Sequence, residues 1–178
     1  MILIRHGQSE FNAVYSKTRV DPGIEDPQLT DEGRRQAEAA AGTLGRNTIR
    51  RVIASPYTRT LQTAEIIAGL LGLPVTVNPV VRERAYFTCD IGSPRSSLLP
   101  QWPHFTFEHF EERWWTDPEE SVAALQVRCD SFQASMADVE DWPHVLVVSH
   151  YAFIEGLTGE TIGNGAMINF DPTAQREG

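Results

Sequence analysis

The sequence contains few cysteines. Cys89 and Cys129 are the only two among 178 residues. They are far apart and do not stand at the spacing of a metal site or of a redox motif. We therefore expect both to be reduced structural thiols and neither to be a nucleophile.

The sequence also lacks an excess of positive charge and a long apolar run. Its net charge is -9, which argues against a nucleic-acid partner because such a partner needs a broad basic surface. An anionic substrate must therefore be small and locally recognised. No apolar run approaches a membrane span, and no secretory signal precedes the first apolar segment. We expect a cytoplasmic protein without a membrane partner, and the oligomeric state stays open.

The residues that are present indicate one soluble domain over residues 1–178. The hydrophobic fraction of 41% suits a folded protein, and the length allows one sizeable core. Strand patterns and helical patterns alternate, which predicts an α/β fold: a three-layer sandwich with a mostly parallel central sheet flanked by helices. The strands are expected at 1–4, 51–55, 74–78, 144–148 and 166–170, and the helices at 30–44, 56–71, 117–139 and 151–157.

Residues 84–116 interrupt this alternation. The segment holds eight of the sixteen aromatic residues and three prolines. Loops of this size are often functional, so we expect a cap or specificity excursion near the active site. The plain alternative is that its aromatic side chains form a satellite core. Its basic residues could contact a second anionic group, although each is more often a surface residue: Arg95, His104, His109 and Arg113.

The end of the first strand carries Arg5, His6 and Gly7 without a spacer. In an open parallel sheet, ligands bind at the carboxyl ends of strands. The arginine fork fits phosphate oxygens, the imidazole can act as a nucleophile or base, and a glycine lets the backbone approach a ligand. The tripeptide indicates an oxyanion site, although polar residues also end strands at ordinary surfaces.

Two further strands end in groups of the same kind. Arg59 lies in the first turn of the helix after the second strand, and a helix amino terminus itself favours anions. His150 follows the apolar strand at 144–148. Because parallel strands end at one edge, we expect these two residues to share a pocket with Arg5 and His6. Such a group of cationic or cationisable side chains needs an anion, and a phosphoryl group fits.

Taken together, the motifs resemble those of the histidine phosphatase superfamily, the phosphoglycerate-mutase-like proteins. Each motif is weak alone, but they span nearly the whole chain in the family's order. The matching residues are Arg5-His6-Gly7 with Ser9 and Asn12, Leu29-Thr30 with Gly33 and Gln36-Ala37, Ser55-Pro56 with Arg59, Thr63 and Ala64, and Ser149-His150. The resemblance implies a phosphatase-type member that acts on a small phosphorylated substrate and needs no metal or other cofactor.

The resemblance also implies the chemistry. His6 would attack phosphorus and form a phosphohistidine, which water would then hydrolyse. His6 must be neutral, so a backbone carbonyl should hold its other ring nitrogen. Arg5, Arg59 and His150 would stabilise charge on the equatorial oxygens. The remaining expected substrate contacts are Gly7, Asn12, Ser149 and Tyr151, with Asn12 contacting the phosphate or orienting His6.

The leaving alcohol needs a proton, and Glu83 stands where one branch of the family carries its acid. Another branch has an acid directly after the second histidine, where this chain has Tyr151. A donor at neutral pH needs a raised pKa, which Arg82 and Arg84 would oppose unless they point away. Asp90 is the reserve candidate. Otherwise Glu83 would be a surface ion-pair residue.

Three other functions remain open on the sequence. Mutases of the family share this core but are usually longer and carry more basic residues for a carboxylate-bearing substrate. A protein without a competent acid would bind a phosphorylated ligand and leave it intact. A metal site is disfavoured because His6 and His150 are accompanied by arginines instead of carboxylates. The aromatic residues weakly favour a ligand with an apolar or planar part.

Overall fold

The computed structural model describes residues 1–45, 48–107, 110–116 and 119–174. Its centre is a six-stranded sheet in the order β4-β3-β2-β5-β1-β6. The strands are β1 (Ile2–Arg5), β2 (Arg51–Ala54), β3 (Val75–Val77), β4 (Thr106–Phe107), β5 (Val145–Ser149) and β6 (Met167–Asn169). Every neighbouring pair is parallel except β1 and β6, which are antiparallel. The predicted fold class is confirmed.

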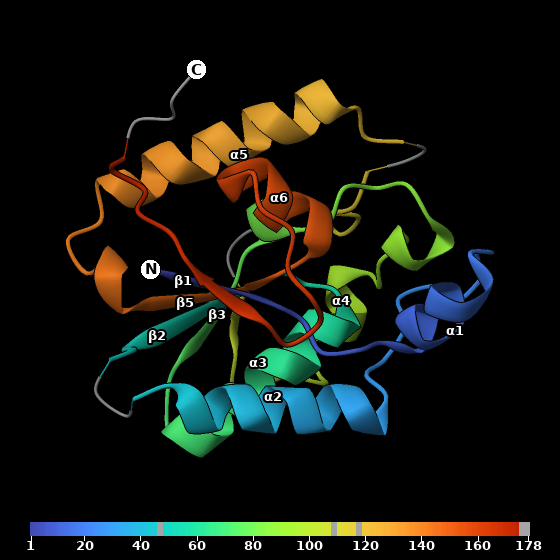
Figure 1. Cartoon of the computed structure of the whole chain (residues 1–178), viewed down its shortest axis with the longest axis horizontal. Helices are drawn as coiled ribbons and strands as arrows, with labels where there is room; N and C mark the ends of the chain where they lie inside the picture. The colour runs from blue at the N-terminus through green and yellow to red at the C-terminus, as the bar shows by residue number, and fades with distance from the viewer. Residues whose placement is uncertain (46–47, 108–109, 117–118, 175–178) are drawn as a thin grey trace.

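Helices cover both faces of this sheet. The helices are α1 (Glu10–Thr18), α2 (Asp31–Thr43), α3 (Thr58–Leu71), α4 (Arg95–Leu98), α5 (Val122–Ala137) and α6 (Tyr151–Thr158). Figure 1 shows α2 and α3 below the sheet and α5 and α6 above it, which gives the three layers. Helix α1 lies apart from both layers, at the right of the view. In the described ranges, no helix has the length and apolar character needed to cross a membrane.

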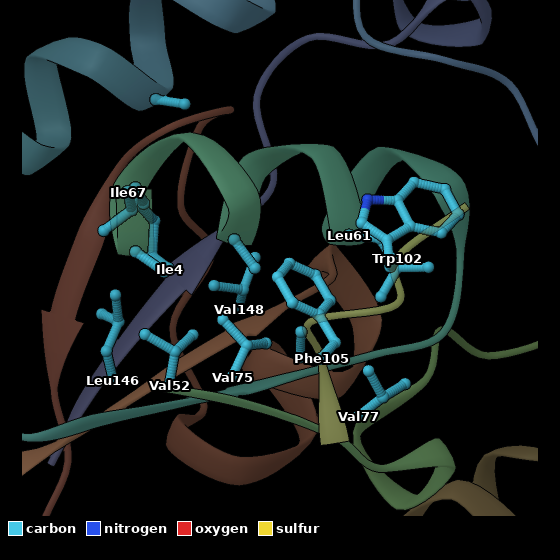
Figure 2. Close-up of a cluster of buried hydrophobic side chains, with 14 of the residues drawn as sticks. Ile4, Val52, Leu61, Ile67, Val75, Val77, Trp102, Phe105, Leu146 and Val148 are labelled. Atoms are coloured by element: carbon cyan, nitrogen blue, oxygen red, sulfur yellow. The ribbon is translucent and has the colours of Figure 1, made fainter. Parts of the chain in front are cut away.

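The strands alternate between two hydrophobic clusters because successive side chains point to opposite faces. Ile4 and Val148 belong to the cluster on the side of α2 and α3, which Figure 2 shows. Leu3 and Val147 belong to the cluster on the side of α5 and α6. Burial on both faces explains why β5 is apolar at nearly every position.

The register of the parallel strands fixes where their polar ends lie. Arg5 of β1 pairs with Ser149 of β5, and Ala54 of β2 pairs with Val148. The residues that follow these strands therefore leave the sheet at the same edge. This is the physical basis of the pocket expected there.

Several elements differ from the sequence prediction. Helix α1 was not predicted, although Ser9 caps it through the backbone N–H of Asn12, whose side chain accepts from the N–H of Ser9. Helix α3 begins at Thr58, two residues later than expected, and α5 begins after its N-cap Ser121. Asp117, where the start of α5 was expected, lies outside the described residues.

The aromatic residues of 84–116 divide into two groups. Trp102, Phe105 and Trp114 are buried in the cluster beneath α3, and Figure 2 shows the first two among its side chains. Tyr86 and Phe87 instead border the cavity described below. The buried aromatic side chains of the excursion thus extend one of the two main hydrophobic clusters, and the expected satellite core is wrong. The excursion also contributes the edge strand β4, which was not predicted because two residues carry no readable period.

Candidate active site

A cavity of about 580 Å³ lies at the carboxyl edge of the central strands. Its lining comes from the residues after β1, from α1, from the first turn of α3, from the segment after β3 and from α6. The expected site residues that line it are Arg5, His6, Asn12, Arg59, Glu83 and Tyr151, together with the reserve acid Asp90. Side chains from distant parts of the chain thus surround one space.

His6 is buried and oriented by its own loop. Its Nδ1 lies 2.7 Å from the carbonyl oxygen of Gly7. A carbonyl only accepts hydrogen bonds, so Nδ1 carries the proton and Nε2 keeps its lone pair. Burial, reinforced by Arg59 and Arg5, holds the pKa of His6 well below its ordinary value. The imidazole is therefore neutral at pH 7 and has an available nucleophilic nitrogen.

Arg5 is only partly satisfied by the surrounding protein. Its Nη1 donates to the carbonyl of Ile162 at 3.1 Å, and its guanidinium lies over the Tyr151 ring, 5.1 Å from the centroid. Its buried Nε has no partner among the described residues. Burial lowers the pKa of Arg5, although Glu83 opposes that shift. A guanidinium with an unused buried donor beside the cavity is suited to an oxyanion.

Arg59 is held by residues of the excursion. Its Nη1 donates to the carbonyl of Cys89 at 2.7 Å, and its Nη2 lies 3.1 Å from Oδ1 of Asp90. Both ion-pair side chains are 3% exposed. Burial alone would lower the pKa of Arg59, but Cys89 and Asp90 more than offset it and raise the pKa. Asp90 thus supplies part of the negative charge that the clustered cations require.

His150 is fully buried and lies beside His6 without bordering the cavity. The two rings meet edge to face, with centroids 5.2 Å apart. His150 Nε2 is 2.8 Å from Oγ of Ser55, whereas its Nδ1 has no partner among the described residues. Burial, together with Arg59 and His6, holds the pKa of His150 well below its ordinary value. This ring is therefore neutral, and one of its nitrogens is unsatisfied among the described residues.

The surroundings of Glu83 raise its pKa, as a proton donor at neutral pH requires. Its Oε1 accepts from the backbone N–H groups of Arg84 and Ala152, at 2.9 and 3.0 Å. Burial and the nearby carboxylate of Asp90 raise the pKa of Glu83 to about 7, against the opposing effect of the Arg84 N–H and of two cavity arginines. A substantial fraction is therefore protonated at neutral pH.

The arginines that flank Glu83 in sequence have other partners. Arg82 donates to Oγ1 of Thr116 at 2.9 Å and lies 3.4 Å from Glu120. Arg84 pairs with Glu119 at 2.9 Å. Their charges are thus directed at neighbouring acids and hydroxyls, which removes the objection that they would keep Glu83 ionised.

Gly7 and Ser149 do not border the cavity. A Cβ on Gly7 would lie 2.2 Å from the carbonyl oxygen of Gly33, so this glycine permits the first loop to touch α2. Ser149 is fully buried and donates its hydroxyl proton to the carbonyl of Val81 at 2.7 Å. Both residues thus support the backbone around the cavity, although they were predicted to contact the substrate.

Asn12 acts within a small amide network that sequence reasoning missed. Asn164 donates from Nδ2 to the carbonyl of His6 and to Oδ1 of Asn12, each at 3.1 Å. Asn12 is therefore linked through Asn164 to the backbone carbonyl of His6, and its Oδ1 also accepts from Ser9. Asn164 lies in a loop before β6, and no spacing or motif marked it.

Other cavity residues also went unpredicted. Helix α1 contributes Phe11, Tyr15 and Ser16, its C-cap is Arg19, and α6 contributes Glu155. The Ser9-x-x-Asn12 capping pattern was the signal that could have revealed α1. The basic residues proposed for a second anion do not border the cavity: Arg95, His104 and Arg113 lie elsewhere. His109 lies outside the described residues.

Comparison with known proteins agrees with this geometry. The sequence model of the histidine phosphatase superfamily (branch 1) matches residues 1–171. A Mycobacterium tuberculosis protein named acid phosphatase is 36% identical over 160 residues, which cover 86% of this chain and 70% of that protein. A Yersinia enterocolitica protein named probable phosphoglycerate mutase GpmB is 32% identical over 161 residues, which cover 84% of this chain and 68% of that protein.

The architecture also matches solved structures. A mycobacterial glucosyl-3-phosphoglycerate phosphatase, solved with VO3, superposes with a TM-score of 0.65. The match covers 94% of this chain and 88% of that one, at 22% sequence identity. At this identity the likeness shows the shared fold alone.

Proposed function

This chain belongs to the histidine phosphatase superfamily, and from that premise we propose that it is a phosphatase that hydrolyses phosphomonoesters through a phosphohistidine on His6. One observation carries the proposal. The neutral His6 imidazole is held at 2.7 Å by the Gly7 carbonyl, in the same cavity as the guanidinium groups of Arg5 and Arg59. The matching acid phosphatase supports hydrolysis as the outcome.

The first chemical step forms the phosphoenzyme. Nε2 of His6 attacks phosphorus, a P–N bond forms and the ester P–O bond breaks. The proton of the Glu83 carboxyl passes to the leaving oxygen and yields a neutral alcohol. Because the pKa of Glu83 is about 7, this proton is available at neutral pH.

Charge stabilisation comes from residues that are already in place. Arg5 and Arg59 lie at the cavity with their guanidinium groups fixed by carbonyls and by Asp90. Fixed donors stabilise developing charge without reorganising during the reaction. We assign the neutral His150 to the same group because its ring lies edge to face with His6, with centroids 5.2 Å apart, and its Nδ1 has no partner among the described residues. The guanidinium group of Arg5 lies over the Tyr151 ring, which borders the same cavity. We therefore propose that Tyr151 contacts the substrate.

The second step regenerates the enzyme. The Glu83 carboxylate accepts a proton from water, whose oxygen attacks phosphorus. The P–N bond breaks, the electron pair returns to His6, and inorganic phosphate leaves. Since Glu83 acts as acid and then as base, one residue near pH 7 serves both steps. Nucleophile, acid and charge stabilisers all come from the chain itself, so we propose that no metal takes part.

Hydrolysis of an aryl phosphate in the presence of a chelator tests the proposal. We expect wild type to turn over p-nitrophenyl phosphate and His6→Ala to lose at least about 10³-fold in kcat. His104→Ala serves as the matched control, because this exposed histidine lies beside Glu65, away from the cavity. A phosphoenzyme that is stable in alkali and labile in acid should accumulate only with His6 present.

Three outcomes would contradict the proposal. Binding of phosphate without hydrolysis of aryl or alkyl esters would indicate a phospholigand-binding protein. Full activity of His6→Ala would place the chemistry on another residue. Activity that required added Mg²⁺ or Zn²⁺ after chelation would contradict the metal-independent route.

Mutase activity is the second candidate, because one relative carries a mutase name. A mutase transfers the phosphoryl group from His6 to a second hydroxyl instead of to water. Incubation with 3-phosphoglycerate distinguishes the two reactions, because a phosphatase releases inorganic phosphate and a mutase forms 2-phosphoglycerate. We expect inorganic phosphate to be the main product.

A further inference from the structure

One side of the cavity is built from four aromatic residues, which we call the aromatic wall: Phe11, Tyr15, Tyr86 and Phe87. The Phe11 and Tyr15 rings are stacked at 5.2 Å, and the Phe87 ring lies 5.3 Å from the first and 5.1 Å from the second. The Tyr86 and Phe87 rings meet edge to face at 4.8 Å. The wall is thus a continuous apolar surface formed by two segments far apart in sequence.

The wall is held by several contacts and is still partly accessible. Phe11 is buried, and Arg19 lies over the Tyr15 ring at 5.9 Å. The backbone N–H groups of Tyr86 and Phe87 both donate to Oδ2 of Asp90, at 3.1 and 3.0 Å. Tyr86 nevertheless remains 58% exposed. A surface that only joined α1 to the excursion would not need to leave rings open to the cavity, whereas a preorganised surface gains affinity for a ligand.

The aromatic wall lies close to the proposed acid Glu83, which must contact the leaving group. Tyr86 and Phe87 follow Glu83 closely in the chain, and all three border the same cavity. The acid must contact the oxygen that leaves phosphorus. The segment that carries the acid therefore continues directly into the wall, and both border the space that the leaving alcohol would occupy.

The presence of a proton donor in the cavity also limits which class of alcohol the substrate ester contains. Phenolic leaving groups depart without much help, whereas alkoxides are strongly basic and need a proton. A buried carboxyl in the cavity is therefore suited to esters of alkyl alcohols. A cavity of about 580 Å³ is of the size that holds small organic ligands, and a phosphoryl group alone would fill little of it.

We propose that the preferred substrates are phosphate monoesters of alkyl alcohols that carry a flat ring close to the ester, and that the ring packs on the aromatic wall. This inference rests on the proposed function for turnover, but its binding part does not. Benzyl phosphate is the simplest example of the class. The phosphoryl group occupies the site of His6, Arg5 and Arg59, and Phe87 lies in the centre of the ring contact.

Binding of two non-hydrolysable phosphonates to the whole protein tests the wall. By calorimetry we expect benzylphosphonate to bind about tenfold more tightly than methylphosphonate. Phe87→Leu should remove most of this preference and leave methylphosphonate affinity unchanged. Phe107→Leu is the matched control, because this phenylalanine of the same excursion packs against the core instead of the cavity. Equal affinities of wild type for the two phosphonates would overturn the proposal.

Turnover separates the two proposals. If benzyl phosphate exceeds methyl phosphate in kcat/KM by about tenfold and Phe87→Leu abolishes the difference, the substrate class is supported. If both esters are hydrolysed equally, the substrate class is wrong and the phosphatase proposal stands. If neither is hydrolysed but benzylphosphonate still binds preferentially, the phosphatase proposal fails and the wall is a ligand-binding surface.

Discussion

At the scale of single residues, the site depends on protonation states that neighbouring groups impose. His6 is neutral because it is buried next to two guanidinium groups, and Glu83 is protonated near neutrality because it is buried near Asp90. The sequence predicted His6 as the nucleophile and Glu83 as the acid, and both roles stay predictions. It could not show that Asp90 compensates Arg59, because the contact joins an excursion of irregular backbone to a helix start.

The raised pKa of Glu83 predicts how kcat falls at alkaline pH. Glu83 donates only when protonated, so kcat for an alkyl phosphate should fall about tenfold per pH unit above about 7. Glu83→Gln should reduce kcat by about 10²-fold near pH 6 and flatten that limb. An aryl phosphate should lose much less, since its leaving group needs little protonation. Initial rates from pH 5 to 9 check this, and an unchanged limb in Glu83→Gln would assign it to another group.

The buried ion pair between Asp90 and Arg59 predicts that loss of the carboxylate alters both stability and the position of Arg59. Asp90→Asn leaves a buried guanidinium without its counter-charge, so we expect a loss of about 3 kcal/mol in the free energy of unfolding. Phosphate affinity should also fall about tenfold, because Arg59 loses its fixed position. Urea unfolding and phosphate titration measure the two effects. Asp141→Asn is the control, because its pair with Arg51 is partly exposed and should be worth at most about 1 kcal/mol.

At the scale of elements, local patterns predicted those helices whose ends and buried faces agree. Helix α2 has the cap Thr30, whose Oγ1 accepts from Gly33 N–H, and a buried alanine stripe, so it was found with nearly correct bounds. Helix α1 buries only Phe11, which leaves no apolar period to read. The carboxyl edge was predictable because strand alternation implies parallel register. The aromatic wall was not, since α1 forms half of it.

The close contact between α2 and the first loop predicts a strong dependence on Gly33. A Cβ there would lie 2.1 Å from the carbonyl oxygen of Gln8, which is backbone and cannot move aside cheaply. We expect Gly33→Ala to destabilise the fold by at least about 2 kcal/mol. Gly42→Ala is the control on the same helix, with open space at its Cβ, and should stabilise by about 0.5 kcal/mol. Similar effects of the two changes would contradict this account of the contact.

At the scale of the whole molecule, the two helix layers contribute to the site unequally. Helix α3 supplies Arg59 directly, whereas α5 reaches the site through the backbone that carries Glu83. Arg128 of α5 donates to the carbonyls of Val80 and Arg82, at 2.8 and 2.7 Å, and pairs with the buried Glu120. The sequence did not indicate this link, because a helical arginine is ordinarily a surface residue.

The contact between Arg128 and the segment of Glu83 predicts that a residue outside the cavity changes kcat for alkyl phosphates alone. In Arg128→Met the carbonyls that hold the segment of Glu83 lose their donor, so the acid loses its fixed position. We expect kcat for alkyl phosphates to fall about tenfold, with aryl phosphates and phosphate affinity nearly unchanged. Stability falls as well, because the buried Glu120 loses its Arg128 pair and keeps only Arg82, at 3.4 Å, as an ion-pair partner among the described residues. Arg128→Met combined with Glu120→Gln removes that charge and should restore stability without restoring kcat. If the double variant regains full activity on alkyl esters, Arg128 is structural alone. A persisting loss confined to alkyl esters means that α5 positions the acid through its contact with the backbone of the segment that carries Glu83.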